Sequence, residues 1–318
     1  MWEYALRRLL MTVPILLGIT IICFALVQIA PGDPVQALLP TNASPEDIAA
    51  MKALYGLDKP LVIQYLSWLA RAVTGDLGIS IGNNSPVTGQ VFKALGNTFT
   101  IAVIAVVIAF ILSTVMGVMS AARKGGVLDR VLTAVAVFGI SVPSFWLAVV
   151  LVILFAVNLQ WLPAMGMGRN GSDNFSWVSW GDLKYAILPI FALTLAPLGV
   201  MMRTTRASVA DALSEDFVET LRAKGLSETQ VTAHALRNSM PSIVAMLGLQ
   251  LGYMIGGSVL VETVFNWPGT GFLLNQAIMT RDIPLLQGSI LVLATGFVLI
   301  NLIVDLLQTI IDPRIKRG

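Results

Sequence analysis

The residues best suited to chemistry in this sequence lie together in one polar stretch, 216–238, DFVETLRAKGLSETQVTAHALRN. The rest of the chain is strongly apolar. Of its 318 residues, 56% are hydrophobic and 12% are charged, and the mean hydropathy is +0.81. Acidic and basic side chains close to a glycine, as in 219–225, can form ion pairs and hydrogen bonds with another macromolecule. The stretch therefore suggests recognition and not bond-breaking catalysis.

Other kinds of chemistry lack the residues that they need. The chain contains no G-x-x-x-x-G-K-[ST] phosphate-binding loop and no Gly-Lys dipeptide, so it cannot hydrolyse ATP by that route. Its one histidine, His234, is too little for a histidine-based metal site or nucleophile, and we expect it at the surface or in packing. Its one cysteine, Cys23, gives no internal disulfide framework. We expect no enzyme activity and no cofactor or metal in this chain.

An amphipathic helix is predicted to lead into the polar stretch, because its apolar residues are spaced by four and share one face. The apolar face consists of Val209, Leu213, Phe217 and Leu221, and the opposite, acidic face of Asp211, Glu215 and Glu219. Gly225 is predicted to end this helix in a left-handed conformation, with Arg222 and Lys224 in the last turn. Ser227 and Gln230 then form a capping box that starts a second helix. Two short helices are therefore expected to meet at a glycine.

This elbow, residues 204–238, must lie outside the lipid hydrocarbon, because inserting one charged residue at the centre of the membrane costs roughly 2.5–3.5 kcal/mol of free energy. It could dock on another protein, or it could lie on the lipid surface with its basic residues toward anionic headgroups. The acidic residues Asp211, Glu215 and Glu219 fit an anionic lipid surface poorly. The sequence therefore favours docking on a protein.

Long uncharged runs before and after the elbow predict an all-α polytopic membrane protein with six transmembrane helices. The runs are 9–32, 94–122, 131–168, 185–202, 238–261 and 283–304. Each can supply the roughly 20 residues that cross a bilayer, and none alternates as a barrel strand does. The first run follows Arg7 and Arg8 as in a signal peptide, but it is too long and has no cleavage site, so we expect it to remain as a helix.

The distribution of lysine and arginine predicts that both termini are cytoplasmic. With that orientation, thirteen of the twenty basic residues fall inside: Arg7, Arg8, Arg123, Lys124, Arg130, Arg203, Arg206, Arg222, Lys224, Arg237, Arg314, Lys316 and Arg317. The other seven fall outside, four of them in the long segment 31–96, which weighs little in this rule. The net charge of +2 reflects this asymmetry and gives no sign of a nucleic-acid partner.

The predicted organisation has four parts: an N-terminal transmembrane helix 1–30, a periplasmic cap 31–96, a five-helix core 97–311 that contains the elbow, and a cytoplasmic tail 312–318. Within the cap we expect a helix from Ser44 to Gly56 and another from Pro60 to about Val73. The connection 262–287 contains glycines and a proline and is expected to be interrupted.

Ionisable residues are scarce in the predicted spans. Glu262 lies near the outer end of the fifth span and Asp305 near the inner end of the sixth, where we expect Asp305 to pair with Arg314 or a helix end. Ion-coupled secondary transporters usually place such groups at mid-membrane, so this class is disfavoured. A membrane anchor with no passage of its own is a further alternative.

Small residues recur in the spans and indicate close packing between helices. Gly248, Gly252 and Gly256 are spaced by four and form one stripe. The stripe could pack within this chain, pack against a partner, or line a passage, and the sequence does not separate these roles.

Residues 219–225, ETLRAKG, resemble the E-A-A-x-x-x-G signature of ATP-binding-cassette (ABC) import permeases, and RAKGL…HALRN looks like the dipeptide and oligopeptide branch. The similarity covers nearly the whole chain, and the order and spacing of its motifs are specific. The further motifs are APGDP at 30–34, YGLDKP at 55–60, GDLGIS at 75–80, ETVFNWPGTG at 262–271, RDIPLLQG at 281–288, NLIVDLL at 301–307 and DPRIKR at 312–317. The chain departs from the signature where Thr220 and Leu221 replace two alanines, and where Pro241 follows HALRN instead of closing an I-x-L-P motif.

The resemblance implies a type I ABC importer permease in the bacterial inner membrane. It implies that the elbow is a coupling helix in a cleft of a cytoplasmic ATPase. The contacts carried over are Glu219, Arg222, Ala223, Lys224, Gly225 and Leu226. The partners implied are a second homologous permease in a heterodimer, two ATPase subunits that hold ATP and Mg, a periplasmic or lipid-anchored solute-binding protein, and membrane lipid. Peptides are the expected solute, with nickel, glutathione, opines and oligosaccharides as alternatives within the branch.

Overall fold

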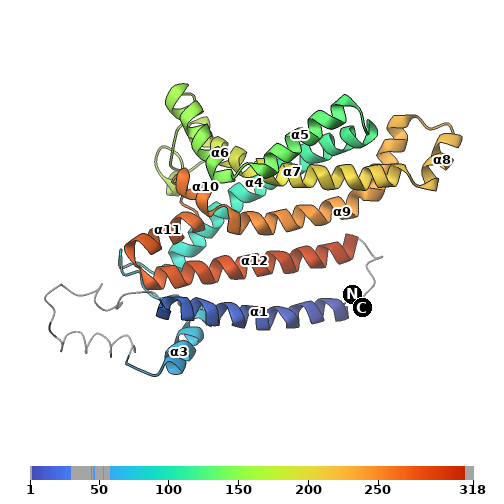
Figure 1. The fold of residues 1–318 in the computed structure, drawn as a ribbon. Helices are drawn as coiled ribbons and strands as arrows, with labels where there is room; N and C mark the ends of the chain where they lie inside the picture. Colours follow the sequence, from blue (N-terminus) through green and yellow to red (C-terminus); the bar gives the residue numbers. More distant parts are fainter. Residues whose placement is uncertain (1, 30–43, 45, 47–52, 54–57, 312–318) are drawn as a thin grey trace.

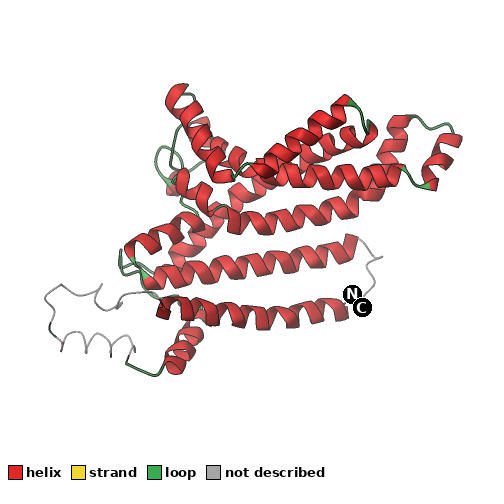
Figure 2. Cartoon of the chain, in the orientation of Figure 1, coloured by secondary structure: helices red, strands yellow, loops and turns green. Residues whose placement is uncertain are grey.

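The computed structural model of the protein describes residues 2–29, 44, 46, 53 and 58–311. Helices make up nearly all of this part of the chain (Figure 2), where the only β-type pairing is an isolated bridge between Ile79 and Pro86. Five of the described helices are long and apolar enough to cross a membrane. They are α1 (Trp2–Ile29), α4 (Val87–Ala122), α7 (Trp180–Leu213), α9 (Glu228–Gly257) and α12 (Ile283–Ile311). The predicted all-α membrane fold is confirmed.

A sixth span is present only as a sharply bent pair of helices. The run 131–168 was expected to form one helix, which is wrong, because α5 (Val127–Ser141) and α6 (Ser144–Leu151) meet at 97°. Pro143 causes the break, since the residue before a proline is forced out of the helical region, and Val142 is extended at φ −85° and ψ 122°. A π-helix, η1 (Val152–Asn158), continues α6, and the chain is then irregular to residue 179 except for the short 3₁₀ turn η2 (Ser172–Asn174).

The described part of the segment 31–96 consists mainly of a helix, a turn and the first residues of α4. Helix α3 (Leu61–Val73) confirms the helix predicted from Pro60 to about Val73, whereas most of the one predicted from Ser44 to Gly56 lies outside the described residues. Helix α4 begins at Val87 and continues through the predicted boundary at 96/97.

Helix α3 lies against the C-terminal half of α1, at the edge of the bundle (Figure 1). The Tyr65 and Trp68 rings pack against Phe24 with centroid distances of 5.5 and 6.1 Å, and the Tyr65 hydroxyl is 2.8 Å from the Thr20 hydroxyl. Since α1 itself packs mainly against α12, both elements are peripheral to the core.

The connection 262–287 is interrupted, as predicted. It contains the end of α10 (Val259–Val264), α11 (Thr270–Thr280) and the start of α12. Glu262 is fully buried here, and its carboxylate accepts hydrogen bonds from the Thr98 hydroxyl at 2.7 Å, the Ser258 hydroxyl at 2.9 Å and the Gly271 N–H at 2.7 Å. This carboxylate therefore joins α4, α10 and the first turn of α11.

The core lies between α4, α7 and α9, where small residues allow close approach. A Cβ atom added to Gly117 would lie 2.6 Å from Cβ of Thr205, so α4 and α7 nearly touch. On α9, added Cβ atoms at Gly248 and Gly252 would meet Val304 at 2.3 Å and Asn301 at 3.0 Å, both on α12. The predicted stripe therefore packs within this chain at these two positions.

The start of α1, the end of α12, the α4–α5 turn and the elbow region all lie at one end of the bundle (Figure 1). The segments predicted to face the cytoplasm thus share a side. At this end Arg8 and Asp305 form an ion pair at 2.8 Å between α1 and α12. Asp305 was expected to pair with Arg314 or a helix end, and Arg314 lies outside the described residues.

Candidate functional site

The elbow, residues 204–238, consists of the end of α7, one short helix, α8 (Asp216–Ala223), and the start of α9. The prediction of a single amphipathic helix through 209–221 is wrong, because α7 ends at Leu213 and Glu215 is extended, at φ −81° and ψ 153°. Ser214 and Asp216 lie at the break between the two helices, and short polar side chains of this kind favour helix ends. Helix α8 turns back so that Val218, only 1% exposed, is buried.

The second helix of the elbow is not short. It begins at Glu228 and continues as the 30-residue α9, with Pro241 inside it. Its predicted capping box is confirmed: the Gln230 N–H donates to the Ser227 hydroxyl at 3.4 Å, and the Ser227 N–H donates to the Gln230 side-chain oxygen at 2.9 Å. The elbow is therefore attached on both sides to helices that reach deep into the bundle.

Gly225 ends α8 in the left-handed conformation, as predicted, with φ +81°. The Gly225 N–H donates to the Arg222 carbonyl at 2.9 Å, and the Leu226 N–H donates to the Leu221 carbonyl at 3.3 Å. This pair of bonds is a Schellman motif, which satisfies carbonyls at the helix end. An added Cβ atom would meet nothing within 4 Å, so the backbone torsion, and not space, requires glycine here.

An ion pair that the sequence did not predict connects α8 to the first residue of α9 on the exposed side of the elbow. The Arg222 guanidinium donates from Nε and Nη2 to the two Glu228 carboxylate oxygens, at 2.8 and 3.0 Å. These bonds, and the negative charge of Glu228, raise the pKa of Arg222 above its ordinary value. The contact of Arg222 with a partner stays a prediction, and within the chain two of its guanidinium nitrogens already bond Glu228. No helix-spacing rule connects residues on either side of a turn, so only the three-dimensional turn reveals the pair.

The six residues predicted to make contacts lie on one continuous turn. Glu219, Arg222, Ala223, Lys224 and Gly225 are exposed, and Leu226 is partly buried. His234 is exposed on α9, as expected for a surface residue. The described residues include no group of three or more His, Cys, Asp and Glu that could hold a metal ion. This turn therefore offers acidic side chains, basic side chains and accessible backbone groups that another molecule could bind.

An apolar cluster joins α7 and α9, the two helices that flank α8, to α4. Buried residues of α4, α7 and α9 form one apolar cluster: Ala121, Val209, Ala210, Ala212, Ala235 and Ile243. The Ser239 hydroxyl of α9 also donates to the Ser208 carbonyl of α7 at 3.0 Å. The two helices that flank α8 are therefore packed against each other and against α4.

Two family models together match almost the whole chain. Residues 1–113 match the N-terminal region of membrane components of binding-protein-dependent transport systems, and residues 113–317 match the inner membrane component of such systems. A dipeptide transport system permease of Alkalihalophilus pseudofirmus is 38% identical over 99% of this chain and 100% of its own length. A peptide permease of Brucella suis is 38% identical and a glutathione transport system permease of Escherichia coli K12 is 39% identical, each over 99% of both chains. The chain therefore belongs to the family of inner membrane components of binding-protein-dependent transport systems, which have the type I ABC permease fold.

Proposed function

We propose that this chain is the permease subunit of an ATP-driven importer of peptides, and that α8 is the element through which cytoplasmic ATPases move it. The observation that carries the proposal is the placement of α8: a capped, water-exposed helix joined without a flexible linker to two long helices of the core. A surface that only anchored the protein to lipid would not need this rigid connection.

The proposed mechanism is alternating access. Two ATPase subunits bind ATP and Mg, close, and draw the elbows of two permeases together. Helices α7 and α9 follow α8 because Val218 of α8 is buried and only two and four residues connect α8 to α7 and to α9. Hydrolysis then returns the helices to their starting positions.

Peptides are the proposed solute class because relatives named for dipeptide, peptide and glutathione transport match the chain over its full length. Dipeptides, peptides and glutathione all contain amide bonds and free carboxylate groups. The remaining partners are proposed on the same basis: a homologous permease in a heterodimer, and a solute-binding protein at the end of the bundle opposite α8. We propose that the elbow and both termini lie in the cytoplasm of a bacterium and that the bundle lies in its inner membrane.

Reconstitution tests this function. The permease pair, the ATPases and the binding protein are placed in proteoliposomes, and uptake of labelled dipeptide and glutathione is measured together with ATP hydrolysis. Uptake should require ATP and the binding protein. Glu219→Lys and Gly225→Pro should reduce uptake per ATP while leaving membrane insertion intact. Uptake driven by a proton or sodium gradient without ATP would contradict the proposal, as would normal uptake by both variants.

A further inference from the structure

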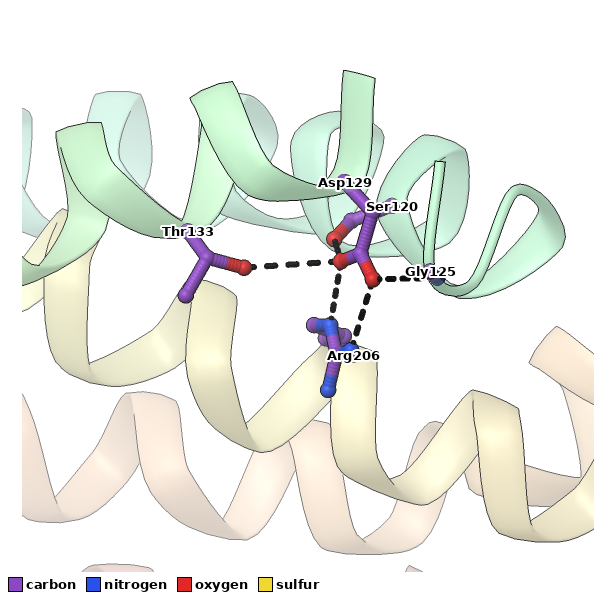
Figure 3. A network of polar contacts seen from close by, with 5 residues as sticks. All are labelled: Ser120, Gly125, Asp129, Thr133 and Arg206. Atoms are coloured by element: carbon purple, nitrogen blue, oxygen red, sulfur yellow. Dashed lines mark hydrogen bonds and ion pairs between the residues drawn. The ribbon is translucent and has the colours of Figure 1, made fainter. Parts of the chain in front are cut away.

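A second polar cluster lies at the same end of the bundle as α8, where α4, α5 and α7 meet (Figure 3). Asp129, in the first turn of α5, is 4% exposed. Its carboxylate accepts two hydrogen bonds from Arg206 of α7, from Nε at 2.6 Å and from Nη2 at 2.8 Å. It also accepts from the Ser120 hydroxyl of α4 at 2.5 Å and from the Gly125 N–H of the α4–α5 turn at 2.8 Å. One carboxylate thus connects three elements.

The place of Arg206 in α7 gives this cluster its relation to the elbow. Arg206 lies about two helical turns before Leu213, the residue at which α7 ends and the chain turns into α8. Its neighbour Thr205 lies at the close approach between α7 and Gly117 of α4. The cluster therefore lies on the part of α7 that receives any displacement of α8.

Helix α5 packs mainly against α7 and α4 among the described helices. An open hollow beside the cluster is lined by Asp129, further α5 residues and Arg206. Toward the bend at Pro143, α5 and α7 approach each other closely at glycines: added Cβ atoms at Gly139 and Gly199 would lie 2.8 and 2.4 Å from the carbonyl oxygens of Leu195 and Ala136. These contacts contain no charged group, whereas the two-bond guanidinium–carboxylate pair fixes both position and angle.

We propose that Asp129 and Arg206 are positioning residues that make α5 move together with α7 when the ATPases displace α8. The proposal rests on the coupling function proposed above. The pair holds the first turn of α5 to the elbow-bearing helix, so that movement reaches the bend at Pro143 and the α6 segment beyond it. Without the pair, α8 still docks and ATP is still hydrolysed, but α5 lags behind and less solute crosses for each ATP.

The test uses the complete importer in proteoliposomes, with uptake and hydrolysis measured on the same samples. Arg206→Met and Asp129→Asn should lower uptake per ATP at least tenfold, while binding of the ATPase subunits and stimulation by the binding protein persist. Arg206→Lys should fall between these variants and the unmodified chain, since a lysine keeps the charge but not the fork. Arg203→Met is the matched control, because Arg203 is an exposed arginine one turn earlier on α7 and outside the cluster.

A distance measurement separates positioning from simple stabilisation. In a Cys23→Ser background, spin labels are placed on exposed positions of α5 and α9, at Val131 and Ala233. The distance between them should stay constant between the nucleotide-free and vanadate-trapped states of the otherwise unmodified complex, and it should change in Arg206→Met.

Three results would overturn the inference. The first is an unchanged ratio of uptake to ATP in Arg206→Met and Asp129→Asn. The second is a label distance that responds identically with and without the pair. The third is loss of assembly in every variant, Arg206→Lys included, which would assign the pair to folding. Failure of the unmodified complex to use ATP would instead refute the proposed function, so the two failures are distinguishable.

Discussion

Two arginine–carboxylate pairs at the same end of the molecule have similar geometry and different surroundings. Arg222 and Glu228 cross the elbow with side chains 48% and 71% exposed, whereas Arg206 and Asp129 join α7 to α5 with side chains 29% and 6% exposed. Water competes for both members of the first pair and for only one member of the second. The exposed pair can open at low cost in water, but opening the sheltered pair leaves the buried Asp129 carboxylate without its two Arg206 donors.

The bonds that hold α7 and those that hold α8 therefore differ in how easily water can replace them. The part proposed to meet another protein is held by bonds that solvent can replace at low cost. The part that connects helices to one another is held by bonds that solvent replaces poorly. Four substitutions test this difference, in order of decreasing expected effect on stability.

The largest effect is expected from Arg206→Met. Removing the guanidinium leaves the Asp129 carboxylate with two fewer donors, which should cost about 1–3 kcal/mol of unfolding free energy. Water from the adjacent hollow should keep the cost below that of a deeply buried pair. The measurement is thermal unfolding of the purified complex in detergent, with Arg203→Met as the control. Equal shifts for both substitutions would remove the contrast between the two pairs.

Gly225→Ala should cost about 1–2 kcal/mol, because a side chain at φ +81° is strained even where space is free. The effect should be local to α8, and faster amide hydrogen exchange there would report it. Gly89→Ala is the control, since Gly89 lies inside α4 without positive φ and an added Cβ atom would again meet nothing within 4 Å. That control should be neutral or stabilising. Similar exchange rates for α8 in both variants would contradict the argument from torsion.

Ser227→Ala removes the cap of α9 and should cost about 1 kcal/mol, which is typical for loss of a serine N-cap. Amides of Gln230 and Val231 should then exchange faster. Thr229→Ala, an exposed change in the same turn, should leave those rates unaltered. Protection that survives in Ser227→Ala would show that the continuous α9, and not its cap, holds the elbow.

The smallest effect is expected from Glu228→Gln. Both members of its pair are exposed, so the unfolding midpoint should not change measurably, and added salt should mimic the substitution. A destabilisation as large as that of Arg206→Met would mean that exposure does not distinguish the pairs.

Features encoded by neighbouring residues were predictable from the sequence. Gly225 as a left-handed terminus, the Ser227–Gln230 capping box, α3 and the interrupted connection after Glu262 are all confirmed. Each depends on the torsions or hydrogen bonds of a few consecutive residues, so the local sequence contains nearly all the information.

Features that depend on the path of the chain were missed. Asp129 and Arg206 are 77 positions apart, and no spacing rule joins them. The spacing of apolar residues by four continues from Val209 to Leu221, yet these residues lie on two helices, α7 and α8. A periodic pattern of apolar residues contains no information about a change in helix direction. The bend at Pro143 had a local signal, but the length of the uncharged run outweighed it in the prediction.

The open space around Gly225 has a consequence for which changes this position can tolerate. Crowding usually explains why a buried glycine cannot be enlarged, and there a compensating reduction in a neighbour can restore the fit. At Gly225 no neighbour is close, so no second-site change in packing can compensate for a chiral residue. Suppressors of a substitution here should arise in the ATPase or in the elbow backbone, and asparagine, which enters left-handed torsions most readily after glycine, should be the mildest replacement.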